Sequence, residues 1–189
     1  MEKKRVVITG LGSLTPVGNT VSDYWTALTS GKSGVSRITK FDVSNFPTQI
    51  AAHLPPFDAE SVFDKKEIRR TSRFIILATM AAAEAVKDSG LDIAPIADHV
   101  GVEIGSGMGG VEILEENQRE LVERGPSKVS PFAVPMMICD MASGQVAIKF
   151  GAKGPNSCSV TACASSANSM GNAFRAIQYG DAIAMITGG

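Results

Sequence analysis

The chain has 189 residues, of which 44% are hydrophobic and 20% charged, a composition typical of a globular domain and not of a disordered chain. Its 18 basic and 19 acidic side chains leave a net charge of −1, so no overall positive charge indicates nucleic-acid binding. The most apolar segment, residues 74–86, is interrupted by Thr79 and Glu84 and falls short of a membrane span. Three cysteines without paired-ligand spacing favour neither a disulfide framework nor a zinc site, and they indicate a reducing cytoplasm.

The pattern of apolar residues predicts strands that alternate with helices. Strands are expected at residues 5–8, 99–104, 156–160 and 182–186, and helices at residues 19–30, 73–89, 111–124, 135–150 and 163–179. Ser72 and Gly90 bracket the second of these helices as an N-cap and a C-terminal stop, and Gly144 weakens the helix at 135–150. This alternation predicts a layered α/β fold with a largely parallel sheet.

Residues 182–189 form an apolar strand that has neither a polar tail nor a closing helix. Natural termini lie more often in exposed polar segments. We therefore expect the 189 residues to be a piece of a longer protein. A chain that simply ends on an edge strand is the alternative.

The segment Ser157–Ser166 carries the clearest chemical signal, because an alternating strand leads to Cys163 and then to a helix of small residues. A thiol at a helix N-terminus meets unpaired N–H groups and the positive end of the helix dipole, which favour a thiolate. The same N–H groups are expected to hold an oxyanion when that thiolate attacks an acyl carbon. We expect the helix to be buried and Cys163 to be the nucleophile. Cys139, within a helix, and Cys158, within a strand, are expected to be inert core residues.

The glycine-rich loop at residues 105–110 matches the spacing G-x-G-x-x-G between a strand and a helix, which is the layout of a dinucleotide-binding loop. That loop belongs in the first strand–helix unit, however, and Glu112, Glu115 and Glu116 in the following helix would repel a pyrophosphate. We therefore interpret the glycines as allowing close packing or a wide substrate channel, and the sequence supports no nucleotide site.

One dense basic cluster stands out in this nearly neutral chain. A solvated charged face explains most such runs, whereas a docking patch for an acidic partner is the functional alternative. The residues alone leave both interpretations open. The cluster comprises Lys65, Lys66, Arg69, Arg70 and Arg73.

Several motifs, in this order and spacing, resemble those of the β-ketoacyl-acyl-carrier-protein synthases, most closely the type II synthases of dissociated bacterial fatty-acid synthesis. The motifs lie at residues 6–12, 15–19, 105–110, 130–132, 154–156 and 161–166. The resemblance covers the whole chain. It implies a thiolase-like fold, in which two similar βαβαβαββ halves pack as an α-β-α-β-α sandwich and pair as homodimers, and residues 1–189 match the N-terminal half only.

The resemblance implies that Cys163 takes the growing acyl chain from acyl-carrier protein as a thioester. Malonyl-carrier protein then loses CO2, and its carbanion attacks the thioester to give 3-oxoacyl-carrier protein. The substrates are carried on the phosphopantetheine arm of the carrier protein, so neither a cofactor nor a metal is expected.

The resemblance also assigns residues around the nucleophile. Met108 matches the position that lines and gates the acyl pocket. Ala133, Val134 and Ile138 match a segment that reaches towards the acyl pocket of the partner subunit. The resemblance also favours the interpretation of the basic cluster as a docking patch. The region of Lys65, Lys66, Arg69 and Arg70 matches the surface that meets the acidic carrier protein.

The family's two active-site histidines, its catalytic lysine and its gating loop match no part of this chain. Neither His53 nor His99 corresponds to them, and both are expected to be structural. We therefore expect residues 1–189 alone to be inactive in condensation and poorly soluble.

Four alternatives come from other classes of protein. A non-catalytic partner subunit that binds acyl groups or sets chain length would typically lack the nucleophile, so Cys163 argues against it. A thiolase-fold acyltransferase acting on acyl-coenzyme A would be separated by comparing the two thioesters. A cysteine hydrolase needs a base partner that the chain does not offer. An interaction module built on the basic cluster would leave Cys163 unexplained.

Overall fold

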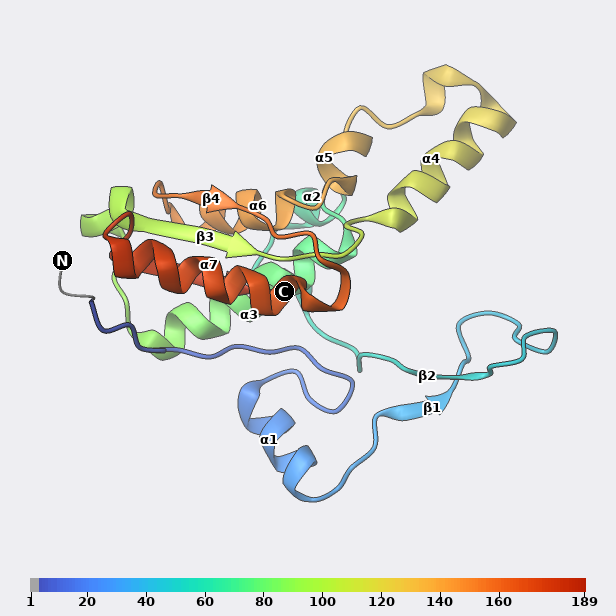
Figure 1. Ribbon diagram of the computed structural model, residues 1–189. Helices are drawn as coiled ribbons and strands as arrows, with labels where there is room; N and C mark the ends of the chain where they lie inside the picture. Colours follow the sequence, from blue (N-terminus) through green and yellow to red (C-terminus); the bar gives the residue numbers. More distant parts are fainter. Residues whose placement is uncertain (1–3) are drawn as a thin grey trace.

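The computed structural model describes residues 4–189, and a short parallel sheet lies at its centre (Figure 1). Its strands are β3 (Val100–Ile104), β4 (Asn156–Ser157) and β5 (Ala184–Gly188), in the order β4–β3–β5. The central strand β3 pairs in parallel with both neighbours and is buried at every position, as expected of a strand covered on both faces. The predicted α/β fold with a parallel sheet is confirmed.

Three helices cover the two faces of this sheet. They are α3 (Arg73–Ser89), α6 (Met141–Phe150) and α7 (Ser165–Tyr179). Alternate residues of β3 point to opposite faces, and those on one face form the apolar core with α3 and α6. The buried core residues are Ala82, Val102, Ile104, Ala142 and Val146.

The opposite face of β3 carries Gly101 and Glu103, with Gly105 directly after the strand, and α7 packs against it. A Cβ at Gly105 would overlap the backbone of Ser165, the first residue of α7. The absence of a side chain at Gly105 therefore lets this helix approach the carboxyl end of β3.

The remaining elements surround this layered body. In Figure 1, α4 and the β1–β2 pair extend away from the sheet. The helices are α1 (Val21–Thr29), α2 (Lys65–Ile68), α4 (Val111–Arg124) and α5 (Ala133–Met137). The antiparallel pair consists of β1 (Val35–Arg37) and β2 (Ile50–Ala52). The 3₁₀ turns are η1 (Ala59–Ser61), η2 (Ala94–His99), η3 (Pro126–Lys128) and η4 (Ala162–Ala164).

The segment at residues 10–21 is bound along α3 by two carboxylates. Glu84 accepts hydrogen bonds from the backbone N–H groups of Ser13 and Val21, each at 2.9 Å, and Asp88 accepts one from Leu11 at 2.9 Å. These contacts link α1 to the main body through the backbone.

Three predicted elements differ from the structure. The helix expected at 135–150 is two helices, because the chain is extended at Ile138 (φ −68°, ψ 141°), so Cys139 lies in the break and not within a helix. The strand expected at 5–8 is not formed, because no strand pairs with it within residues 4–189, and Val7 and Ile8 are exposed. The strand expected at 156–160 is shorter, so Cys158 lies just after β4.

Candidate functional site

Cys163 lies in η4, the one-turn 3₁₀ segment that joins the chain after β4 to the start of α7. The residue is exposed, so a molecule in solution has access to it. Its predicted place at the N-terminal end of a helix is confirmed, although α7 begins two residues later, at Ser165. Its role as nucleophile stays a prediction.

The expectation that the small-residue helix is buried is wrong. Ser165, Ser169 and Ala173 are its buried residues, whereas Met170 and Phe174 are almost half exposed. Small side chains allow α7 to approach the sheet on one side, but they do not require a neighbour on the other side.

Ala162 gives the turn before Cys163 an unusual backbone. Within residues 4–189 it is the only non-glycine residue with a positive φ, at 51°. The left-handed conformation costs alanine about 1–2 kcal/mol, so the surrounding structure must hold it. No sequence signal marks this position, because alanine has no preference for that conformation.

Two side chains of α7 bind the backbone and side chains of this turn. The Ser165 hydroxyl accepts a hydrogen bond from the Thr161 N–H at 2.9 Å and donates one to the Ala162 carbonyl at 2.7 Å. The Asn168 amide donates to the Thr161 hydroxyl at 2.6 Å. The turn that presents Cys163 is thus tied to the first turn of α7.

The glycine-rich loop at 105–110 packs against the same turn. A Cβ at Gly105 would overlap the carbonyl oxygen of Ser165, whereas one at Gly107 would lie 3.4 Å from the Ala162 Cα, which is an ordinary contact distance. Gly105 is therefore needed for close approach between two backbone segments. The packing interpretation of the loop is confirmed.

The residues expected at the acyl pocket lie in this loop and in the segment bound to its other end. The Gly110 N–H donates to the Met137 carbonyl at 2.9 Å, which joins the loop to α5. The side chain of Met108 is 70% exposed. The other three residues are Ala133 and Val134 in α5 and Ile138 directly after it. The structure thus brings one loop into contact with both the Cys163 turn and α5, and the pocket role of these residues stays a prediction.

A buried carboxylate that the sequence pattern did not predict lies beneath the site. Glu103 on β3 is 5% exposed, and its Oε1 accepts hydrogen bonds from Ser159 Oγ at 2.9 Å and Asn172 Nδ2 at 2.8 Å. These bonds join β3 to α7 and to the segment leading to Cys163. One charged residue within an otherwise apolar strand was the available signal.

The basic cluster begins on α2, a helix of only four residues that carries Lys65 and Lys66, and continues through Arg69 and Arg70 to Arg73 at the start of α3. Asp64 caps α2 by accepting from the N–H groups of Lys66 and Glu67, and the Glu67 carboxylate in turn accepts from the Asp64 N–H, each at 2.7 Å. The hydrogen bond from the backbone N–H of Glu67 lowers the pKa of Asp64 below its usual value. This reciprocal capping holds a helix too short to be stable alone.

The cluster's cations have different partners. Lys65 lies 3.7 Å from Glu60 in an exposed ion pair, whereas Lys66 and Arg69 form no ion pair with any residue in 4–189. The Arg70 guanidinium lies 4.7 Å from the centre of the Phe132 ring, a cation–π contact that joins α2 to the segment before α5. The Arg69 Nε donates a hydrogen bond to the Lys65 carbonyl at 3.2 Å, which does not neutralise its charge. The charges of Lys66 and Arg69 therefore have no opposite charge beside them within residues 4–189.

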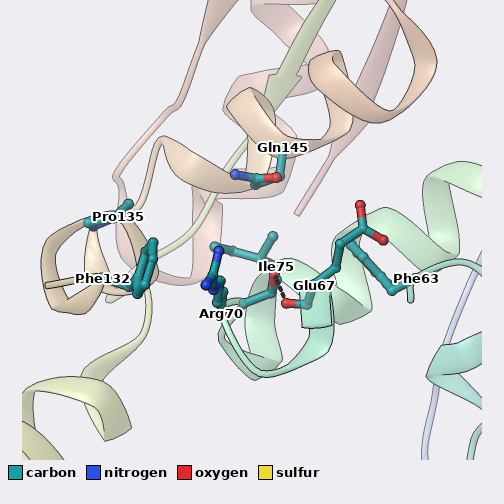
Figure 2. A pocket seen from close by; sticks show the side chains of 8 residues that line it. Phe63, Glu67, Arg70, Ile75, Phe132, Pro135 and Gln145 are labelled. Atoms are coloured by element: carbon teal, nitrogen blue, oxygen red, sulfur yellow. Dashed lines mark hydrogen bonds between the residues drawn. The ribbon is translucent and has the colours of Figure 1, made fainter. Parts of the chain in front are cut away.

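A cavity opens between this cluster and the segment around α5. Figure 2 shows Arg70 between Phe132 on one side and Ile75 on the other, with Gln145 above them. Apolar and charged groups both line it, and Cys163 does not. The lining residues are Phe63, Glu67, Arg70, Thr71, Ile75, Phe132, Pro135 and Gln145.

The other thiols differ from Cys163 in their surroundings. Cys139 and Cys158 are half-buried, and burial raises the pKa of the Cys158 thiol. Within residues 4–189, no three His, Cys, Asp or Glu side chains lie together as metal ligands would. No helix in this part of the chain is both long enough and apolar enough to cross a membrane.

Comparison with known proteins relates this arrangement to one family. Residues 3–189 match the family model for the β-ketoacyl synthase N-terminal domain. Two curated proteins named 3-oxoacyl-[acyl-carrier-protein] synthase 2 match this chain. The one from Synechocystis sp. is 50% identical to it, and the one from Coxiella burnetii is 53% identical. Each match covers 100% of this chain and 46% of the relative, so the chain spans about half the length of these relatives.

Two solved structures share the fold. A β-ketoacyl synthase from Burkholderia phymatum STM815 superposes with a TM-score of 0.82 at 29% identity, covering 95% of this chain and 45% of that one. The ishigamide ketosynthase/chain length factor gives a TM-score of 0.86 at 25% identity, covering 96% of this chain and 46% of that one. The expected thiolase-like fold is confirmed.

Proposed function

Because this chain belongs to the β-ketoacyl synthase family, we propose that it supplies the nucleophile of a 3-oxoacyl-acyl-carrier-protein synthase that elongates fatty acids. The single observation that carries the proposal is the exposed Cys163 on a turn held at the N-terminal end of α7. Relatives at 50–53% identity bear the name of this activity.

In the first half-reaction, the Cys163 sulfur attacks the carbonyl carbon of an acyl thioester. A new C–S bond forms, the carrier's C–S bond breaks, and the carrier leaves as its thiol after taking a proton. The backbone N–H of Cys163 supports the oxyanion that forms between these steps. The acyl chain then extends along a wall that includes Met108, and Ala133, Val134 and Ile138 serve the pocket of the partner subunit in a homodimer.

In the second half-reaction, malonyl-carrier protein loses CO2 and its carbanion attacks the carbonyl carbon of the Cys163 thioester. A C–C bond forms, the C–S bond to Cys163 breaks, and the 3-oxoacyl product leaves the Cys163 sulfur behind as a thiolate. This step needs groups that stabilise the enolate, and the histidines assigned to it in the family match no residue of this chain. We propose that residues 1–189 form the N-terminal half of the complete unit and do not condense alone.

The acyl-carrier protein is the proposed partner, and its docking surface is the cluster of Lys65, Lys66, Arg69 and Arg70. Two observations support this surface: Lys66 and Arg69 have no ion-pair partner within residues 4–189, and a reciprocal cap holds the short helix that carries Lys66 and ends at Arg69. An acidic partner gains encounter rate from such a patch. No cofactor enters the proposed reaction, and a reducing cytoplasm suits its free thiol.

The experiment that tests the nucleophile is an intact mass spectrum before and after incubation with acyl-carrier protein thioester. An added acyl mass that is retained in Cys158→Ala and lost in Cys163→Ala supports the transfer step. An equal increment in Cys163→Ala contradicts it. Parallel incubation with acyl-coenzyme A distinguishes the carrier from the alternative donor, since transfer only from coenzyme A contradicts the proposed partner.

The docking surface has its own test. The double variant Lys66→Glu, Arg69→Glu is expected to weaken carrier binding at least tenfold, measured by titration at low and high salt. Lys40→Glu, an exposed charge reversal outside the cluster, is the control. Carrier binding that is equal in the double variant and the control would remove the cluster from the proposal.

A further inference from the structure

The turn that presents Cys163 contains one residue, Ala162, in a backbone conformation that is unfavourable without support from its surroundings. Ala162 has φ 51°, and an alanine released from its neighbours would return to a negative φ. Such a change rotates the peptide that follows Ala162, which carries the N–H of Cys163. Whatever holds Ala162 therefore holds both the thiol and the proposed oxyanion donor.

The hydroxyl of Ser165 bridges the two sides of Ala162. It accepts a hydrogen bond from the N–H of Thr161, the residue before Ala162, at 2.9 Å. It donates one to the carbonyl of Ala162 itself at 2.7 Å. The residue is 4% exposed, so water does not compete freely for these bonds. One hydroxyl group thus restrains both backbone dihedral angles of Ala162.

Ser165 is itself fixed by the glycine-rich loop. A Cβ at Gly105 would overlap the carbonyl oxygen of Ser165, so β3 and α7 are in direct backbone contact at this point. The Ser165 hydroxyl therefore links the buried end of the strand to the turn that carries the exposed cysteine. The function of Gly105, the first glycine of the loop, is thus to allow this packing and not to bind a nucleotide.

We infer that Ser165 is the positioning residue of the nucleophile, acting through the backbone of Thr161 and Ala162. The inference rests on the proposed role of Cys163. Ser165 touches no reacting atom in this scheme. Its hydroxyl keeps the turn in the conformation that presents the exposed cysteine beside the start of α7.

Ser169 offers a matched control on the same helix. It lies one turn after Ser165 on the same face, is fully buried, and its hydroxyl has no hydrogen-bond partner within residues 4–189. Ser165→Ala and Ser169→Ala therefore remove the same atom from similar surroundings, but only the first removes bonds to the turn. Ser165→Thr keeps the hydroxyl.

The test is the alkylation rate of each cysteine by iodoacetamide, followed by peptide mass spectrometry. Ser165→Ala is expected to slow alkylation of Cys163 about fivefold, because a thiol that leaves this turn loses the helix N-terminal N–H groups that favour attack. Ser169→Ala and Ser165→Thr are expected to stay within about twofold of the unmodified chain. A general loosening of the fold would instead raise alkylation rates, since it would expose the half-buried Cys139 and Cys158.

Three results would overturn the inference. The first is a Cys163 rate in Ser165→Ala that stays within about twofold of the unmodified chain. The second is a Cys163 rate that rises together with the rates of Cys139 and Cys158 in Ser165→Ala. The third is an equal slowing in Ser169→Ala. Alkylation needs neither carrier protein nor condensation, so the inference is tested even if the chain accepts no acyl group, and the acyl-transfer experiment tests the proposed function separately.

A measurement on the unmodified chain covers the case in which Ser165→Ala does not fold. Thr161 is an exposed residue, so its amide is expected to be protected from hydrogen exchange only by its bond to Ser165. Protection of about tenfold or more over an unbonded amide supports the inference. Exchange at the rate of an unbonded amide overturns it.

Discussion

Glu103 and Asn172 are joined by a hydrogen bond of 2.8 Å between the Asn172 side-chain amide and the Glu103 carboxylate, where α7 crosses β3. The same amide lies 3.2 Å from the hydroxyl of Ser159, which also donates to Glu103. A strand, a helix and the segment before Cys163 therefore share one buried acceptor. Such an acceptor is stabilising only while its partners are present.

Replacing Glu103 with alanine is expected to lower the free energy of unfolding by about 2 kcal/mol, because two hydrogen bonds to a buried carboxylate are lost. Asn172→Ala is expected to cost less, and the double variant should show a coupling of about 1 kcal/mol. Urea denaturation measures all three. Glu116→Ala, on the exposed side of α4, is the control, and a loss as small as that of the control would contradict a structural role for Glu103.

Two glycines close to the nucleophile are expected to respond oppositely to alanine. At Gly171, within α7, an added Cβ meets nothing within 4 Å, so Gly171→Ala should stabilise the chain by about 1 kcal/mol. At Gly105 the Cβ overlaps the backbone of Ser165, so Gly105→Ala should destabilise it by about 2 kcal/mol. Thermal unfolding compares them, and a shift of the same sign in both variants contradicts this packing.

The three thiols are expected to differ in reactivity. Burial raises the pKa of Cys158 above its usual value of 9.0, so less thiolate is present at pH 7.5 than in a free thiol. We expect alkylation of Cys158 to be at least about tenfold slower than that of the exposed Cys163. Its rate should rise as the pH passes through the raised pKa. Site-resolved mass spectrometry after brief iodoacetamide treatment measures the ratio, and equal rates would contradict the burial of Cys158.

The cap of α2 is expected to depend on pH. The Asp64 pKa is lower in the folded chain than its usual 3.8, so the cap's contribution is complete above about pH 4. It is lost as the pH falls through the lower folded value. The NMR shift of the Glu67 amide proton should therefore titrate with a midpoint below 3.8. Asp64→Asn keeps an acceptor and should abolish this transition, whereas a midpoint at or above 3.8 in the unmodified chain contradicts the cap.

Local sequence signals predicted the long helices accurately. α3 and α4 have the expected bounds because each ends at a glycine, and Ser72 precedes α3. The break between α5 and α6 was not predicted. Next to it, the Gly110 N–H donates to the Met137 carbonyl, and such a hydrogen bond between residues distant in sequence leaves no local signal. The strand at residues 5–8 failed for a related reason, since an apolar run forms a strand only where a neighbour offers hydrogen bonds.

The candidate site shows the same division. Composition and the strand-to-helix pattern were enough to place Cys163 before α7. They did not reveal the positive φ of Ala162 or the bridging hydroxyl of Ser165, because each depends on backbone geometry set by the contact with Gly105. The basic cluster was readable from charge alone, whereas the contact between Arg70 and Phe132 required the fold.

The parallel register of the sheet sets an order of assembly. Val100 of β3 pairs with Ala184 of β5, so one edge of the sheet cannot close until residues 84 positions apart have met. Long-range pairing of this kind forms slowly compared with the local hydrogen bonds of a helix. Until β5 has paired, β3 lacks one of its two neighbours, so the strand end against which the start of α7 packs is not yet held on both sides. The thiol of Cys163 therefore acquires its final surroundings only in the last, long-range step of folding, although its own turn is made of local contacts.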